Sequence, residues 1–169
     1  LQGILATAAA PDQFGLPLVV QPDAFQQPLR QHITVAPKPV HGRINDREAF
    51  EQVLQERLPV ITQAIDDAKE NQRKTGQRSA VIIFVTQREQ AEKLTQTLVS
   101  HVDCAVDYFH AGLDAATREE VYEHFRAGEV NVLVATKAFG MGMDIPDIHW
   151  AIHLAPPAFL EDYLQEVGR

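Results

Sequence analysis

Four short segments of the sequence place glycine or polar residues directly after an apolar run. They are residues 86–88, 110–112, 136–144 and the region after Leu154. Short apolar runs are typical of buried strands, and an open parallel sheet binds ligands beyond the C-terminal ends of its strands. If the runs belong to one sheet, the four segments gather at one edge and form a binding site.

The most informative segment reads Thr-Lys-Ala-Phe-Gly-Met-Gly-Met-Asp. Thr136 and Lys137 supply a hydroxyl and a cation, the usual groups for a phosphate. Gly140 and Gly142 let the backbone approach a ligand closely or adopt a positive φ. Asp144 can accept hydrogen bonds from a ribose hydroxyl. The segment predicts a phosphate or nucleotide contact, and the alternative is a tight turn whose glycines only form the bend.

Two absences limit the chemistry of this chain. The sequence contains no G-x-x-x-x-G-K-[ST] motif, and no Asp-Glu pair follows a predicted strand to hold magnesium. We therefore do not expect the chain to bind and hydrolyse a nucleoside triphosphate by itself.

No metal site is predicted either. Cys104 is the single cysteine, which excludes an internal disulfide and a multi-cysteine zinc site and favours a reducing, intracellular compartment. It has no visible activating partner, so we interpret it as a core residue. His149 and His153 fall on one face of a predicted strand but too far apart for one metal ion. Trp150, on the other face, is expected in the core.

Composition and charge restrict the class of protein. The chain has 169 residues, 45% hydrophobic and 22% charged, as in soluble globular domains. The longest apolar run, residues 80–85, is far shorter than the roughly 20 residues of a membrane helix, and the N-terminal residues lack the basic start of a signal peptide. The net charge of −8 arises entirely after residue 78. Any nucleic-acid role must therefore rest on local contacts or on another part of a larger protein.

Before residue 79 the sequence predicts two regions. Residues 1–45 are rich in Pro and Gln, which favours a connecting segment with short strands at most. Residues 46–78 predict a helical lead-in and a loop. The helix begins near Asn45, which has capping-box spacing to Glu48. Pro59 either kinks one helix or begins a second, and the polar stretch 71–78 is predicted as a loop.

Residues 79–169 alternate between predicted strands and helices. A capping box of Thr86 and Glu89 begins one helix, Asp114 caps the next, and Gly128 ends it. Strands are expected over 80–85, 104–109, 130–135 and 148–154, and a last helix over 158–167. This alternation predicts an α/β fold with a parallel sheet and helices on both faces.

Three runs then point to a known family: VIIFVTQREQAEKL, YFHAGLDAATREEVYEHFRAGEVNVLVATKAFGMGMDIPDIHWAIH and YLQEVGR. From about Ser79 to Arg169 the chain resembles the second RecA-like domain of RecQ-family DNA helicases, members of superfamily 2. The Ala-Phe-Gly-Met-Gly sequence resembles this family rather than the RNA-helicase branch. The resemblance implies a RecA-like sheet, a P-loop NTPase-like fold without the P-loop. It also implies an ATP-dependent parent enzyme that separates DNA strands in the 3′ to 5′ direction.

The resemblance also implies roles for individual residues. The DNA-binding residues implied by the resemblance form three pairs. Thr86 and Arg88 would contact the nucleic-acid backbone or hold the loop, His110 and Gly112 would lie near the phosphates of the bound strand, and Thr136 and Lys137 would face DNA. Nucleotide contacts fall on Gly142, Asp144, Gln165 and Gly168. Arg169, in the sixth helicase motif, is the catalytic candidate, because it would reach the γ-phosphate held by another domain. The motif's second arginine, the better candidate for an arginine finger, would lie beyond the chain's end.

The expected cofactors and partners follow from the same resemblance. ATP and Mg²⁺ would be bound mainly by a first RecA-like domain, which this sequence lacks, and that domain would be the partner in cis. DNA would be the partner of the parent protein, whereas the chain alone is expected to be an inactive monomer with no membrane association. Two alternatives stay open: an RNA-directed or remodelling ATPase of superfamily 2, and a non-catalytic interaction module that retains the fold.

Overall fold

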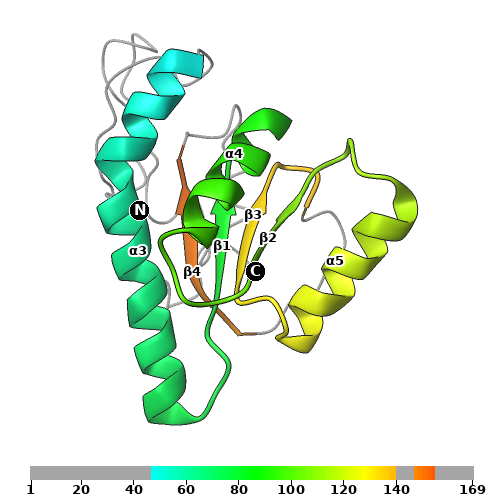
Figure 1. Cartoon of the computed structure of the whole chain (residues 1–169). Helices are drawn as coiled ribbons and strands as arrows, with labels where there is room; N and C mark the ends of the chain where they lie inside the picture. The colour runs from blue at the N-terminus through cyan, green and yellow to red at the C-terminus, as the bar shows by residue number, and fades with distance from the viewer. Residues whose placement is uncertain (1–46, 140–146, 155–169) are drawn as a thin grey trace, which may run out of the picture. The chain divides into compact units, whose positions relative to one another are not determined.

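The computed structural model describes residues 47–139 and 147–154, which belong to one compact unit of the chain. The predicted connecting segment over 1–45 and the predicted helix over 158–167 lie outside these residues. Figure 1 shows that helices and strands alternate along the described chain except at its last two elements, which are both strands. The elements are α3 (Arg47–Thr75), β1 (Ala80–Phe84), α4 (Arg88–Val99), β2 (Val106–Phe109), α5 (Ala115–Ala127), β3 (Val132–Ala135) and β4 (Ile148–His153).

The four strands form one sheet in the order β2-β3-β1-β4, and every neighbouring pair is parallel. The central strand β1 is buried at all five positions, because it has a strand on each side and a core on each face. The strands predicted to begin at residues 104 and 130 instead begin at Val106 and Val132. The parallel α/β class predicted from the sequence is confirmed.

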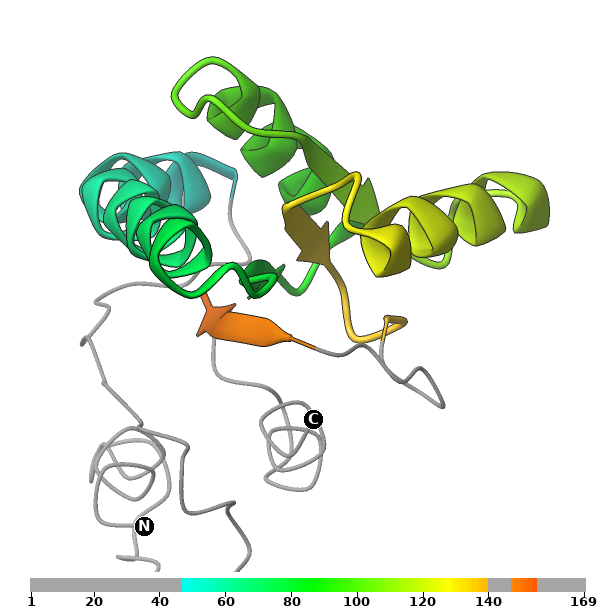
Figure 2. The same cartoon turned by 90° about the horizontal axis from the view of Figure 1, so that it is seen from below.

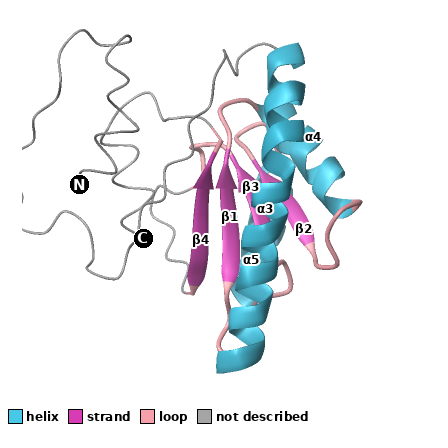
Figure 3. Ribbon diagram, turned by 90° about the vertical axis from the view of Figure 1, so that its left-hand side faces the viewer, coloured by secondary structure: helices cyan, strands magenta, loops and turns pink. Residues whose placement is uncertain are grey.

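Helices cover both faces of this sheet, as Figure 2 shows, and Figure 3 shows the four strands side by side in the order of their pairing. Helices α3 and α4 pack on one face, where Val81 and Ile83 of β1 point. Helix α5 packs on the other, against Ile82 and Phe84. Each face therefore has its own hydrophobic core. Successive residues of β1 point to opposite faces, so this one strand contributes side chains to both cores.

Helix α3 corrects one sequence-based expectation and settles another. It is a single helix with an exposed Pro59 inside it, held on the sheet by the buried Ile61 and Ile65. It also continues to Thr75, so the loop predicted over 71–78 is wrong in its first half. No described helix, α3 included, has the length and apolar character of a membrane span.

Local interactions explain why α3 continues through this polar stretch. Glu70 pairs with Arg73 one turn later at 2.8 Å, and the hydroxyl of Thr75 donates to the carbonyl of Asn71 at 2.8 Å. Such contacts stabilise the polar last turns of a helix where no apolar side chain packs on the sheet. Gly76, whose φ of 69° lies in the left-handed region, ends the helix.

The start of α4 differs from the predicted capping box of Thr86 and Glu89. The N-cap is Gln87, and the side chain of Gln90 accepts a hydrogen bond from the Gln87 backbone amide at 3.2 Å. The capping box therefore forms one residue further along the chain than predicted. The buried side chain of Gln90, and not that of Glu89, accepts the hydrogen bond from the backbone of the N-cap residue.

Both predicted ends of α5 are confirmed. Asp114 accepts hydrogen bonds from the amide and the hydroxyl of Thr117 at 3.0 and 2.6 Å, which lower the pKa of its carboxyl. Gly128 ends the helix in the left-handed conformation, with a φ of 82°. The β2–α5 loop and the α5–β3 loop are thus fixed by local sequence.

Strand β4 is less regular than its sequence predicts. Ala80 pairs with Ile148 and Val81 with Trp150, so His149 is an extra residue in the strand. This bulge breaks the alternation that placed His149 and His153 on one face. Trp150, predicted in the core, is partly buried and packs against the core on the α3 side of the sheet.

Candidate functional site

Three of the four predicted loops meet at the C-terminal edge of the sheet. Hydrogen bonds continue the strand pairing into them: the amide of Val85 donates to Ala135 at 2.9 Å, and that of Thr136 donates to Phe109 at 3.1 Å. The loops that follow β1, β2 and β3 therefore lie side by side. The fourth begins after Leu154, at the limit of the described residues.

Thr86 forms the first part of this edge and uses its side chain within the fold. Its hydroxyl donates to Oε1 of Gln90 at 3.0 Å, and its backbone amide points to the same oxygen at 3.2 Å. Of the two roles that the resemblance left open for Thr86, the geometry supports holding the loop.

His110 is buried directly behind the edge, with 4% of its surface exposed. Its Nδ1 accepts a hydrogen bond from the backbone amide of Gly112 at 3.1 Å, and its Nε2 lies 3.1 Å from Oε1 of Glu92. Its ring also stacks on Tyr108, with 5.4 Å between centroids. His110 therefore links α4 to the loop after β2, and it does not offer its ring to a ligand.

Arg88 lies over the same loop. A Cβ on Gly112 would come within 2.9 Å of Arg88 Nη1, 3.1 Å of Arg88 Cδ and 3.1 Å of His110 Nδ1. Arg88 itself is exposed, and no carboxylate of the described residues lies within ion-pair distance of it. A cation without a counterion at the surface of a ligand-binding edge is suited to bind a phosphate.

Lys137 supplies a second cation at this edge. It is exposed after β3, whereas the preceding Thr136 is buried, with 8% of its surface exposed. Phe139 anchors the turn: its amide donates to the Thr136 carbonyl at 2.9 Å, and its ring packs edge-to-face on Phe109. Of these two predicted DNA-facing residues, the structure thus presents Lys137 to solvent and places Thr136 mostly inside.

The remaining predicted site residues lie outside the described part of the chain: Gly142, Asp144, Gln165, Gly168 and Arg169. Their nucleotide-binding and catalytic roles stay predictions. Within residues 47–139 and 147–154 no group of three His, Cys, Asp or Glu side chains is placed to hold a metal ion.

Glu92 is the site residue that sequence reasoning missed. It lies 18 residues before His110, on a different element, and acidic residues on a helix surface are common. Only the packing of α4 beside β2 brings the two side chains together. The only feature of the sequence that could have indicated Glu92 was its position one helical turn after Arg88.

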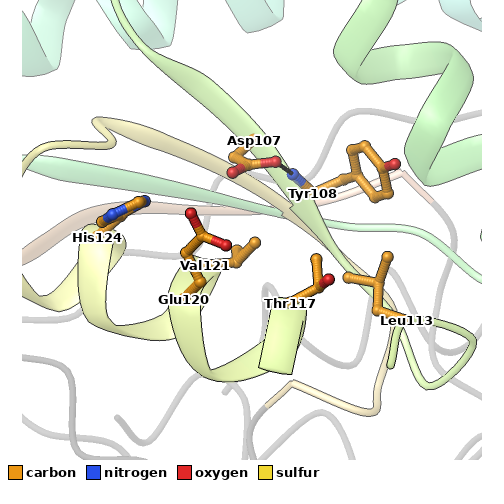
Figure 4. Close-up of a pocket in the computed structure, with 7 residues that line it drawn as sticks. All are labelled: Asp107, Tyr108, Leu113, Thr117, Glu120, Val121 and His124. Carbon is orange, nitrogen blue, oxygen red and sulfur yellow. Dashed lines mark hydrogen bonds between the residues drawn. The ribbon is translucent and has the colours of Figure 1, made fainter. Parts of the chain in front are cut away.

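A separate hollow of about 200 Å³ lies between β2 and α5. Figure 4 shows its lining residues: Asp107, Tyr108, Leu113, Thr117, Glu120, Val121 and His124. The carboxyl groups of Asp107 and Glu120 would repel a phosphate, so this hollow is not part of the candidate site.

Comparisons with known proteins agree with this architecture. The family model of the helicase conserved C-terminal domain matches residues 56–169. The ATP-dependent DNA helicase RecQ of Haemophilus influenzae is 32% identical over 165 residues, 96% of this chain and 25% of that protein. RecQ of Synechocystis is 38% identical over 88 residues, 52% of this chain and 18% of that protein. Dbp5 of S. cerevisiae, solved with RNA and ADP BeF3, gives a TM-score of 0.52 at 24% identity, over 72% of this chain and 29% of that chain.

The parallel sheet, the helices on both faces and the likeness to Dbp5 define a RecA-like α/β domain. More specifically, the chain belongs to the helicase conserved C-terminal domain family, and its relatives place it among the RecQ-type members. The chain spans a quarter or less of the length of these two relatives.

Proposed function

We propose that this chain is the second motor domain of an ATP-dependent, RecQ-like DNA helicase. In the longer protein, ATP hydrolysis would drive 3′ to 5′ strand separation as two RecA-like domains close and open on one strand. The family match over residues 56–169 and the similarity to RecQ, an ATP-dependent DNA helicase, support this proposal.

The observation that carries the proposal is the pair of cations at the C-terminal edge of the sheet. Arg88 and Lys137 are both exposed, and neither forms an ion pair with the described residues. Hydrogen bonds between β1, β3 and β2 make their loops neighbours. Two such cations can contact phosphates of one strand even though the chain is acidic overall.

The nucleotide would be bound mainly by the first RecA-like domain. Magnesium would be bound there together with the nucleotide. ATP supplies the free energy for domain closure, and the sixth motif of this chain would contribute Arg169 to the developing charge on the γ-phosphate. Gly142, Asp144, Gln165 and Gly168 would contact the nucleotide from the same side.

DNA is favoured over RNA by the Ala-Phe-Gly-Met-Gly sequence and by the relatives, which are DNA helicases by name. The likeness to an RNA-bound protein shows the fold alone. An RNA-directed or remodelling ATPase would bind RNA of the same sequence more tightly than DNA. A non-catalytic module would show no salt-dependent nucleic-acid binding through this edge.

Fluorescence anisotropy with a labelled oligonucleotide tests the proposal on the chain itself. We expect weak binding of single-stranded DNA that falls as salt rises, with a log–log slope near −0.7 for each phosphate contact. Arg88→Ala and Lys137→Ala should each make that slope less negative by about 0.7, because each removes one phosphate contact. Arg126→Ala, which removes an arginine paired with Glu123 on α5, is the matched control. Unchanged slopes in both site variants would overturn the proposal.

A further inference from the structure

Glu92 has no role in any motif, yet it is the outermost member of a chain of contacts that ends at Arg88. Its side chain is about half exposed, at 47%, whereas that of His110 beside it is 5% exposed. The contact joins Glu92 Oε1 to His110 Nε2 at 3.1 Å. Glu92 therefore lies where solvent meets the buried histidine.

The two neighbours of His110 determine which of its nitrogens carries the proton. The Gly112 amide donates to Nδ1, so Nδ1 must have a free lone pair. The proton of the neutral ring then lies on Nε2, which donates to the Glu92 carboxylate. Without that acceptor the ring can adopt the other tautomer, in which Nδ1–H would face the Gly112 N–H, donor against donor.

The position of Gly112 in turn matters for Arg88. The Arg88 side chain passes within 3.1 Å, at Cδ, of the place that a Cβ of Gly112 would occupy. A shift of the loop at Gly112 would therefore move the guanidinium. The contacts run from Glu92 through His110 and Gly112 to the cation at the surface.

We propose that Glu92 is a positioning residue for nucleic-acid binding: by fixing the tautomer of His110 it holds the Gly112 loop that supports Arg88. This inference rests on the proposed function, because it takes the ligand of Arg88 to be a phosphate of a bound strand. Glu92 does not touch that ligand, and it acts through His110.

If the Glu92 carboxylate is removed, electrostatics and positioning predict opposite changes in the affinity for nucleic acid. Loss of a negative charge one helical turn from Arg88, by itself, strengthens the binding of a polyanion. Loss of a positioning contact weakens it. Glu89 provides a matched control, since it is an exposed carboxylate on the first turn of the same helix, next to Arg88.

The test is the affinity of the full chain for a labelled single-stranded oligonucleotide at low salt, with thermal unfolding to confirm the fold. We expect Glu92→Ala to weaken binding about fivefold, as loss of one net hydrogen bond does. Glu89→Ala should bind as tightly as the unmodified chain or slightly tighter. Glu92→Gln, whose amide oxygen still accepts from Nε2–H, should restore affinity to within about twofold. Equal affinities for Glu92→Ala and Glu89→Ala would overturn the proposal.

A spectroscopic measurement separates this inference from the proposed function. Long-range ¹H–¹⁵N spectra of the labelled chain report the tautomer of His110 without any DNA. We expect Nε2–H in the unmodified chain and a mixture of tautomers in Glu92→Ala. An Nδ1–H tautomer in the unmodified chain would overturn the role of Glu92, whereas absence of DNA binding with the expected tautomer would overturn the proposed function.

Discussion

Arg88 occupies the space that a side chain at position 112 would need. A Cβ on Gly112 would lie 2.9 Å from Nη1 of Arg88, closer than non-bonded carbon and nitrogen atoms approach. The glycines with positive φ among the described residues are Gly76 and Gly128. Gly112 is therefore required for the close approach of another side chain, and not for an unusual backbone conformation.

Gly112→Ala should displace Arg88 and leave the fold intact, because the closest atom is the mobile end of a long side chain. We expect single-stranded DNA binding to weaken about threefold to fivefold. In an Arg88→Ala background the same substitution should have no further effect, since the side chain that it displaces is gone. Anisotropy titrations of the two single variants and the double variant measure this coupling.

Gly76→Ala is the control for that experiment. No atom lies within 4 Å of a Cβ at Gly76, but its φ of 69° is unfavourable for alanine. The expected outcome is a loss of about 1 kcal/mol in unfolding free energy and unchanged DNA affinity. Additive losses of affinity for Gly112→Ala and Arg88→Ala would show that the two residues act independently.

Arg78 should contribute to stability and not to binding. Its guanidinium donates to the carbonyls of Phe125 and Arg126 at the end of α5, and lies 5.0 Å from the centroid of the Phe125 ring. We expect Arg78→Ala to lower the unfolding free energy by about 2 kcal/mol, from lost charge-assisted hydrogen bonds and a cation–π contact.

Urea titration of the Arg78 variants checks this expectation. Arg78→Lys should recover less than half of the lost unfolding free energy. The planar guanidinium presents several N–H donors in a fixed arrangement that matches two carbonyls, whereas an ammonium group does not. DNA affinity should not change, since Arg78 precedes β1 and thus lies at the opposite end of the sheet from Arg88. A destabilisation below about 0.5 kcal/mol would show that the contacts at the end of α5 contribute little.

His153 should make the stability of the domain depend on pH. Burial lowers the pKa of His153 from 6.5 to about 4, and its ring stacks on Phe84 with 4.9 Å between centroids. Between these two pKa values the unfolded chain binds a proton more readily than the folded chain. Stability is therefore complete above about pH 6.5 and is lost as the pH falls towards 4.

We expect His153 to account for a loss of about 2 kcal/mol in unfolding free energy between about pH 7 and about pH 5. Urea titrations at both pH values, on the unmodified chain and on His153→Asn, isolate this contribution from those of other groups. The variant should be less stable at the higher pH but should lose less on acidification. Parallel losses in both proteins would show that His153 does not titrate in this range.

The elements that position the site were predictable because their signals are local. The apolar run of β1, the Asp114 cap and the left-handed Gly128 each depend on residues a few positions apart, and the structure confirms them. The end of α3 was predicted wrongly because polar residues there stabilise a helix by pairing with one another, as Glu70 and Arg73 do.

The arrangement of the site was only partly predictable. The rule that parallel sheets bind ligands beyond the C-terminal ends of their strands placed Thr86, His110 and Lys137 at one edge, and they lie there. The rule says nothing about which side chains face solvent, so it did not distinguish the exposed Lys137 from the buried Thr136. The contact between Glu92 and His110 depends on the packing of α4 beside β2, which no local pattern encodes.

The last prediction concerns Arg169, the proposed catalytic residue, in a protein that also carries the first RecA-like domain. A contact made mainly in the closed, reacting state appears in turnover more than in nucleotide affinity. Arginine contacts to transferring phosphoryl groups are worth about 10³-fold or more, and a second arginine sharing the role would reduce that figure. We therefore expect Arg169→Ala to lower DNA-stimulated ATP hydrolysis at least about tenfold.

Steady-state ATPase measurements at saturating DNA decide the outcome. Arg169→Lys should recover little activity, because a point charge does not replace the planar guanidinium. Arg126→Ala is again the control, since Arg126 is paired with Glu123 on the surface of α5 at 2.7 Å and should leave turnover unchanged. If Arg169→Ala keeps turnover near that of the unmodified enzyme, Arg169 does not stabilise the reacting phosphate, and the sixth-motif assignment fails at that position.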